Sequence, residues 1–411
     1  MTDSMPEPAK IEFLTRDTGD AGFQTHQVQS CEARQLFRPR RLPESSWEVT
    51  PQPRSIDGAH FVLRSLERDR YVLLNAQEYF LWEHFDGNHT LGEIARIFHF
   101  EFGAFDYSII AQFLTRLHAA GLLQEAGTAG LEPSVASHGA RRLARALLRL
   151  RNAWSRFSLK LSRADRYCAA IYRHGGFLLF NRLALALCMA LSAYALLAAY
   201  RLWPQAKQLT LGVAATPVLS TTVLILAMLA VAILHVLVHA LACKAYGRKV
   251  RELGFFLMQG VLPTFYADVT DIFMSSRRAR IVVDLAGPLV EVTFGSIAFI
   301  AAYWSEPGVE QSLFFVAGVL LWEGAVLNLY PFNFLELDGY NILADLLAMP
   351  TLRQRALALL PKLPRRLIRG PKLRKVESVE AGYLAICFVS VIVYIVLHLD
   401  AVGLGWLIRP T

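Results

Sequence analysis

Two histidines lie four residues apart near the end of a long apolar segment. The segment runs from Val218 to Gly247, and the histidines are His235 and His239. Residues four apart occupy the same face of a helix, so both imidazoles would point the same way. Paired histidines at this spacing form half of the H-E-x-x-H zinc signature, but its glutamate position holds Val236. The pattern predicts a metal site without its usual general base; the alternative is two helix-packed histidines bonded to neighbouring carbonyls.

The composition places this histidine pair in a membrane protein. Of the 411 residues, 54% are hydrophobic, and the mean hydropathy is +0.34. These values are typical of a chain divided between a soluble part and a membrane part. A bilayer core is crossed by about 20 apolar residues in a helix. Apolar runs of this kind predict about five spans, at 183–200, 218–247, 281–304, 312–330 and 381–399.

The charged residues predict an orientation for these spans. The formal net charge is +8, and lysine and arginine gather after the second and fourth predicted spans. The positive-inside rule then places the N-terminal part in the cytoplasm and the C-terminus outside. This arrangement explains the basic charge without nucleic-acid binding. The five cysteines contain no C-x-x-C pair, so neither a disulfide framework nor a thiolate zinc site is indicated. The polar first residues do not resemble a secretory signal peptide.

A carboxylate follows the fourth span at the depth expected for the histidines. The second and fourth spans both run inward, so Asp338 is expected near His235 and His239. Two histidines and one carboxylate, with a fourth position open to water, are a common catalytic zinc set. Pro331 and Gly339 interrupt helical regularity near this carboxylate. Irregular backbone is tolerated at membrane depth where it is buried in protein or lines a wet cavity.

Other carboxylates are candidates to replace the general base that Val236 lacks. Glu291 follows Gly-Pro in the third span, and Glu323 lies in the middle of the fourth. Asp284 lies near a cytoplasmic end, and Glu252 is expected to be solvated in a loop. The alternative for the two glutamates is structural pairing with polar neighbours, so the catalytic group stays unassigned at this point.

The segment 51–125 has the pattern of a small α+β domain. Residues 60–64 and 70–74 predict two strands, and three apolar-periodic helices follow. A capping box at Thr90 and Glu93 opens the second helix, and Gly121 suits the left-handed position after the third. This order predicts a winged helix.

The remaining segments are a flexible arm at 1–50, a linker with a basic amphipathic helix on an anionic inner leaflet at 126–174, and a membrane domain at 175–411. The fold class is therefore mainly α, a polytopic helical membrane bundle with a small N-terminal winged-helix domain.

The N-terminal domain resembles PqqD-type domains, which bind leader peptides of ribosomally made, modified peptides. The resemblance rests on residues Tyr71–Asn75, Trp82, Asp86-Gly87, Thr90 with Glu93-Ile94, and Leu117 with Gly121–Leu123. It implies an edge strand that takes up a peptide by strand addition. The alternative is a winged helix that regulates or dimerises.

The membrane half resembles the site-2 protease type of intramembrane zinc metallopeptidase, and within it the peptide zinc metalloprotease branch of bacteria. The resemblance rests on His235 and His239 with Ala240–Ala242 and Tyr246-Gly247, and on Asp268–Asp271, Arg277–Arg280, Ala286–Pro288, Leu337–Tyr340 and Pro350–Arg353. It implies Zn²⁺ as cofactor, metal ligation by His235, His239 and Asp338, a strand-like insert at 252–274 that aligns substrate, and residence in the bacterial inner membrane. The family's glutamate is Val236 here, and the Asn328-to-Asp338 spacing exceeds the family's commonest form, which gives no support for a role of Asn328.

Three functions follow as hypotheses. The first is a membrane metallopeptidase that acts on a peptide delivered by its own N-terminal domain, in maturation or export of a modified peptide. The second is a pseudoprotease that binds a peptide or membrane partner without cutting it, which Val236 motivates. A third, a peptide-exporter subunit, would need a transporter or peptide-modifying partner, because the chain has no G-x-x-x-x-G-K-[ST] loop.

Overall fold

The chain forms two compact units. The computed structural model describes residues 10–15, 24–29, 38–53, 58–102, 107–124, 158–161, 163–258, 262–362 and 375–401. The first unit is Met1–His138 and the second is Gly139–Thr411. Each unit has its own apolar clusters, so each is described by itself.

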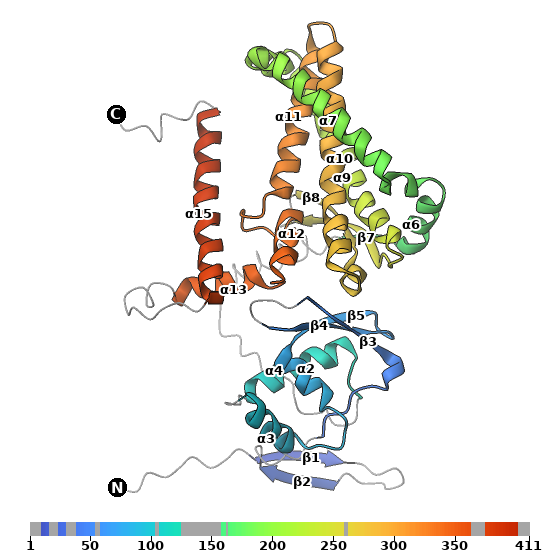
Figure 1. Cartoon of the computed structure of the whole chain (residues 1–411), viewed down its shortest axis with the longest axis vertical. Coiled ribbons are helices and arrows are strands. Elements are labelled where there is room, and N and C mark those ends of the chain that lie inside the picture. The colour runs from blue at the N-terminus through green and yellow to red at the C-terminus, as the bar shows by residue number, and fades with distance from the viewer. Residues whose placement is uncertain are drawn as a thin grey trace. The chain divides into compact units, whose positions relative to one another are not determined.

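The first unit combines an antiparallel sheet with three helices (Figure 1). The sheet order is β3-β4-β5, and the strands are β3 (Trp47–Pro51), β4 (His60–Ser65) and β5 (Arg70–Asn75). The helices are α2 (Ala76–Glu83), α3 (Leu91–Phe102) and α4 (Tyr107–Ala120). A separate hairpin pairs β1 (Lys10–Thr15) with β2 (Gln24–Gln29). The two predicted strands and three predicted helices are therefore present in the predicted order.

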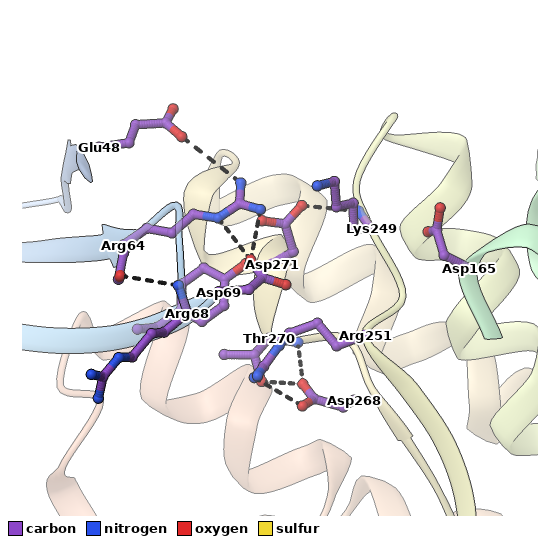
Figure 2. Close-up of polar contacts among 12 residues, drawn as sticks. Glu48, Arg64, Arg68, Asp69, Asp165, Lys249, Arg251, Asp268, Thr270 and Asp271 are labelled. Atoms are coloured by element: carbon purple, nitrogen blue, oxygen red, sulfur yellow. Dashed lines mark hydrogen bonds and ion pairs between the residues drawn. The ribbon is translucent and has the colours of Figure 1, made fainter. Parts of the chain in front are cut away.

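Local sequence signals set the ends of these elements. Thr90 and Glu93 exchange hydrogen bonds at the start of α3, which is the predicted capping box. Gly121 adopts a φ of +66° after α4, as its position predicts. The β4–β5 turn places Asp69 at a φ of +47°, where its carboxylate accepts hydrogen bonds from the Arg64 guanidinium (Figure 2). The core behind the sheet then forms from alternating strand residues and one face of each helix, chiefly Leu63, Leu74, Trp82, Phe85, Ile94, Phe113 and Leu117.

The prediction of a flexible arm at 1–50 is wrong for the last residues of that segment. Trp47 opens β3, which pairs with β4, and its indole packs edge-on against Trp82 with ring centroids 5.4 Å apart. Arg41 N–H donates to the Phe85 carbonyl at 2.8 Å, and Leu42 N–H to the Leu122 carbonyl at 3.0 Å. Residues 38–50 thus belong to the domain, because they cover an aromatic core that two strands alone would leave open.

Among its described residues, the second unit contains five helices long and apolar enough to cross a membrane. They include α7 (Arg182–Leu202), α9 (Pro217–Ala245), α10 (Arg277–Trp304), α11 (Val309–Leu329) and α15 (Lys375–Ala401) (Figure 1). Each of the five predicted spans coincides with one of these helices, with ends shifted by a few residues. Helix α10 packs against α7, α9 and α11, and half of its most apolar stretch is buried. It is therefore the central helix of this unit.

Shorter helices precede, connect or follow the spans. They are α6 (Ala164–Arg173), α8 (Ala206–Gly212), α12 (Asp338–Leu347) and α13 (Leu352–Leu359). Helix α15 contacts α13, and the Tyr394 hydroxyl on α15 donates to Glu323 of α11 at 3.2 Å. These contacts attach the last span to the segment that carries Asp338.

The second unit also contains a three-stranded antiparallel sheet, of which two strands lie between α9 and α10 in sequence and the third precedes α6. Its order is β6-β7-β8, with β6 (Ser158–Leu161), β7 (Glu252–Met258) and β8 (Leu262–Asp268). Strand β8 packs against α9. The prediction of an amphipathic helix within 126–174 is wrong for Ser158–Leu161. These residues form β6, which pairs with β7. Most of that predicted linker and basic helix lies outside the described residues, and α6 is its described helical part.

Candidate metal centre

The two histidines lie together on the side of α9 that faces α10. Their ring centroids are 4.7 Å apart, and their Nε2 atoms are separated by 3.0 Å. His239 Nδ1 lies 2.6 Å from the Val283 carbonyl of α10, to which its N–H donates. A donor role at Nδ1 leaves Nε2 with the lone pair that a metal ligand needs. The spacing of four residues therefore produces the shared face that the sequence predicted.

Asp338 joins the pair from the first turn of α12. Its Oδ2 lies 3.3 Å from His235 Nε2, and its Oδ1 lies 3.5 Å from His239 Nε2. The neighbouring Gly339 permits this approach, since a Cβ there would lie 2.0 Å from the Leu329 carbonyl at the end of α11. The structure thus brings together all three side chains that the sequence singled out.

The donor atoms of the three side chains lie at separations close to those of a zinc site. In a tetrahedral site with bonds of about 2.0–2.2 Å, neighbouring ligand atoms lie about 3.3–3.6 Å apart. The two Nε2 atoms are 3.0 Å apart, Asp338 Oδ2 lies 3.3 Å from His235 and Oδ1 lies 3.5 Å from His239, all within a few tenths of an ångström of this range. One donor atom from each residue lies within 4.8 Å of the other two. Two imidazole lone pairs and a carboxylate this close repel one another unless protons or a cation lie between them. The donor set therefore accommodates a small divalent ion.

Gly287 keeps the space beside these ligand atoms open. A Cβ at this position of α10 would lie 2.2 Å from His239 Nε2 and 2.5 Å from His235 Nε2. Any other residue would therefore occupy the place toward which both nitrogens point. Sequence reasoning noticed Gly287 only as part of a family motif; its role depends on the packing of α10 against α9, which no local pattern reports.

The candidate bases fall in different places. Glu291 of α10 lies beside His235, with Oε1 3.1 Å from Nδ1, and accepts from the Asn328 side-chain amide. Glu323 instead bonds to Tyr394 of α15. The side chain of Asp284, one helical turn before Gly287, makes no hydrogen bond or ion pair with another described residue. Asn328, whose spacing from Asp338 gives no support for the family's role, contacts Glu291 through its side-chain amide.

A polar network fixes the segment that follows Asp338. The Tyr340 hydroxyl accepts a hydrogen bond from the Arg353 backbone N–H at 3.0 Å, and the Arg353 guanidinium donates to the Phe334 carbonyl at 2.7 Å. The Arg280 guanidinium on α10 donates to both oxygens of Asp345 on α12 at 2.9 Å. Residues from three of the motifs noted in the sequence thus hold α12, and with it Asp338, against α10.

The insert between α9 and α10 is held by two acidic residues (Figure 2). Asp268, at the end of β8, accepts hydrogen bonds from the Arg251 guanidinium and the Thr270 backbone N–H. Asp271 is buried and accepts from the Lys249 backbone N–H at 2.9 Å. The predicted Asp-Val-Thr-Asp motif therefore fixes where the sheet leaves and rejoins the helices.

The polar face of this sheet carries a cross-strand contact. The Tyr266 hydroxyl of β8 donates to Glu252 of β7, which also pairs with Lys160 of β6 at 3.0 Å. Burial and the Glu252 carboxylate raise the pKa of Tyr266 to about 12, and the hydrogen bond from Tyr266 lowers the pKa of Glu252. Glu252 was expected to be solvated in a loop; it lies in a strand and links all three strands.

Comparisons with known proteins give one similarity. Over 119 residues the chain is 29% identical to "Putative peptide zinc metalloprotease protein YydH" of Bacillus subtilis (strain 168). The match covers 28% of this chain and 44% of that protein, so the chain spans less than half of the relative's length. No protein-family profile matches the chain, and no solved structure matches it. The chain is thus similar, in part, to a protein named for peptide hydrolysis with zinc.

Proposed function

We propose that this chain is a membrane-embedded, zinc-binding protein of the metallopeptidase type, whose ligands are His235, His239 and Asp338. The observation that carries the proposal is the meeting of these three side chains at separations that suit zinc, beside a glycine whose Cβ would block them. The partial similarity to a relative named as a peptide zinc metalloprotease supports the same class. The five apolar helices support a bilayer environment.

The chain's residues would divide the work of peptide hydrolysis. His235, His239 and Asp338 would hold the ion, and zinc would supply a Lewis acid that polarises a carbonyl and lowers the pKa of water to about 7. Val283 orients His239 through its carbonyl. Strand β8, at the edge of its sheet beside α9, would align an extended peptide by strand addition.

Cleavage by the purified chain tests this proposal. The full-length protein in detergent micelles is incubated with a defined mixture of unstructured peptides, and products are identified by mass spectrometry. We expect peptide bonds to be cut, a chelator to stop the reaction, and His239→Ala to remove it. Cleavage that survives His239→Ala would contradict the proposed site.

A second candidate function is favoured by Val236. General-base catalysis is typically worth about 10²–10⁴-fold, and Val236 cannot supply it. In this pseudoprotease hypothesis, the site binds zinc and a peptide or protein partner and retains it uncut. Val236→Glu separates the two functions. We expect it to raise cleavage by about 10²–10⁴-fold if the missing base limits the native chain. Rapid cleavage by the native chain would reject the pseudoprotease.

We also propose that the N-terminal unit presents a peptide at a sheet edge, as its resemblance to PqqD-type domains implies. In the described sheet, β3 and β5 are the edge strands, and the Leu73 carbonyl on β5 already accepts from Arg116. Edge strands bind extended peptides through backbone hydrogen bonds. A bound leader peptide should slow hydrogen exchange in β3 or β5; unchanged exchange at saturating peptide would reject this role. A transporter or a peptide-modifying enzyme is the partner expected for such a function.

The proposed location is the bacterial inner membrane, with the N-terminal unit in the cytoplasm and the C-terminus outside. The distribution of lysine and arginine supports this orientation. Cysteine-accessibility labelling of intact cells tests it, because a cysteine introduced near residue 50 should be protected from an impermeant reagent. Labelling at that position without permeabilisation would reverse the proposed topology.

A further inference from the structure

One carboxylate in the membrane-spanning part is placed behind a proposed zinc ligand. Glu291 of α10 has Oε1 3.1 Å from His235 Nδ1, and both side chains are only 13% exposed. The side-chain amide of Asn328, on α11, donates to both carboxylate oxygens at 3.0 Å. An acidic residue inside a membrane helix is costly and is usually retained for a purpose. Three separate spans thus contribute to one buried polar chain that ends at His235.

The geometry shows which side of His235 this carboxylate serves. The Nε2 atom of His235 faces Asp338 at 3.3 Å, whereas Glu291 faces Nδ1. The two ring nitrogens point in different directions, and the hydrogen bond at one determines how the other can bind a metal. Glu291 therefore lies on the side of the ring opposite the three ligand atoms. This position does not suit a general base, which must face the reacting water.

His235 Nδ1 needs an acceptor at this position. It is a buried nitrogen whose contact with Glu291 has the distance of a hydrogen bond but not its alignment. His239, the other proposed ligand, already has the equivalent partner in the Val283 carbonyl, also on α10. Helix α10 thus supplies the outer partner of both histidines.

We propose that Glu291 is a positioning residue that orients His235 for metal binding, and that Asn328 holds Glu291 in place. Glu291 would accept a hydrogen bond from the Nδ1–H group, which keeps the proton on Nδ1 and leaves the Nε2 lone pair free to bind the ion. The proposal rests on the proposed zinc site, and it assigns the acidic residue of the third span to ligand orientation rather than to proton transfer. Partners of this kind typically change metal affinity by about 10–100-fold.

The experiment measures zinc affinity of the full-length chain in detergent micelles, by competition with a chromophoric chelator. We expect Glu291→Ala to weaken zinc binding by about 10–100-fold. Glu291→Gln should lose less, about 3–10-fold, because its amide oxygen still accepts from Nδ1. The zinc affinity of Asn328→Ala should lie between that of Glu291→Gln and that of the native chain. The matched control is Glu323→Ala, a membrane glutamate bonded to Tyr394 instead, which should leave zinc affinity unchanged.

A second readout separates orientation from general stability. With Co²⁺ in place of zinc, the visible absorption bands should shift in Glu291→Ala and return toward the native spectrum in Glu291→Gln. Zinc affinity and a cobalt spectrum unchanged in both Glu291 variants would overturn the inference while leaving the proposed function intact. An equal loss in Glu323→Ala would also overturn it, by showing that any buried glutamate is needed. If the native chain itself binds no zinc, the proposed function fails, and the positioning role with it. Should Glu291→Ala not fold, the near-isosteric Glu291→Gln decides alone.

Discussion

The N-terminal domain and the candidate metal centre are built by opposite means. In the domain, Leu63, Trp82 and Phe113 are buried among apolar neighbours, and local caps such as Thr90 with Glu93 set the helix ends. In the metal centre, two imidazoles and a carboxylate from α9 and α12 converge inside an apolar bundle. Burial of apolar surface stabilises the first region, whereas the second accumulates polar groups that need a compensating partner. The first region is organised for stability and the second for binding.

This contrast predicts that one added methyl group can abolish zinc binding without unfolding the helical bundle. Gly287→Ala places a Cβ 2.2 Å from His239 Nε2, so we expect loss of measurable zinc binding, read by metal analysis after gel filtration. Gly382→Ala on α15 is the matched control, because a Cβ there meets nothing within 4 Å. Alanine is favoured over glycine in helices by about 1 kcal/mol, so the control should bind zinc normally. A native zinc content in Gly287→Ala would contradict the claim that the metal centre depends on the space beside Gly287.

The reverse experiment damages the domain and leaves the metal centre intact. Phe113 is 1% exposed in the domain core, and truncation of a buried Phe to Ala typically costs about 3–5 kcal/mol. We expect Phe113→Ala in the full chain to lower the protection of α4 amides from hydrogen exchange by that amount while zinc content stays native. Phe100→Ala is the control, since Phe100 is 89% exposed. Equal destabilisation by both variants would show that this core is not where stability resides.

A smaller effect concerns the sheet beside the metal centre. The pKa of Glu252 is lowered from its usual 4.5 by the Tyr266 hydroxyl, so this contact stabilises the sheet above pH 4.5. The contribution is lost as the pH falls through the lowered folded value. The raised pKa of Tyr266, about 12, gives stabilisation that is full below pH 10 and lost as the pH rises toward 12. Tyr266→Phe should speed exchange of β7 and β8 amides at pH 7 by less than about tenfold, because exposed contacts are worth about 1 kcal/mol or less. No change at pH 7 would show that the contact is energetically neutral.

Sequence patterns predicted the parts of both regions that depend on local chemistry. Two short apolar runs around a turn identified β4 and β5, Thr90 with Glu93 identified a helix start, and the longer apolar runs identified the five spans. His235, His239 and Asp338 could be proposed because helix periodicity and span direction place them at one depth. Gly287, Val283 and the Glu291–Asn328 contact could not, because they depend on which faces of α9, α10 and α11 pack together. The strands β3 and β6 were missed for a similar reason, since each is formed by pairing with a strand already in place.

Metal content tests the central claim most directly. The purified chain, expressed with zinc in the medium and washed in detergent, is analysed by inductively coupled plasma mass spectrometry beside Asp338→Ala. The account predicts close to one zinc per native chain and a much lower content in the variant, because two imidazoles alone leave the site without its anionic ligand. A native chain without zinc, or an Asp338→Ala variant that retains it fully, would contradict the account.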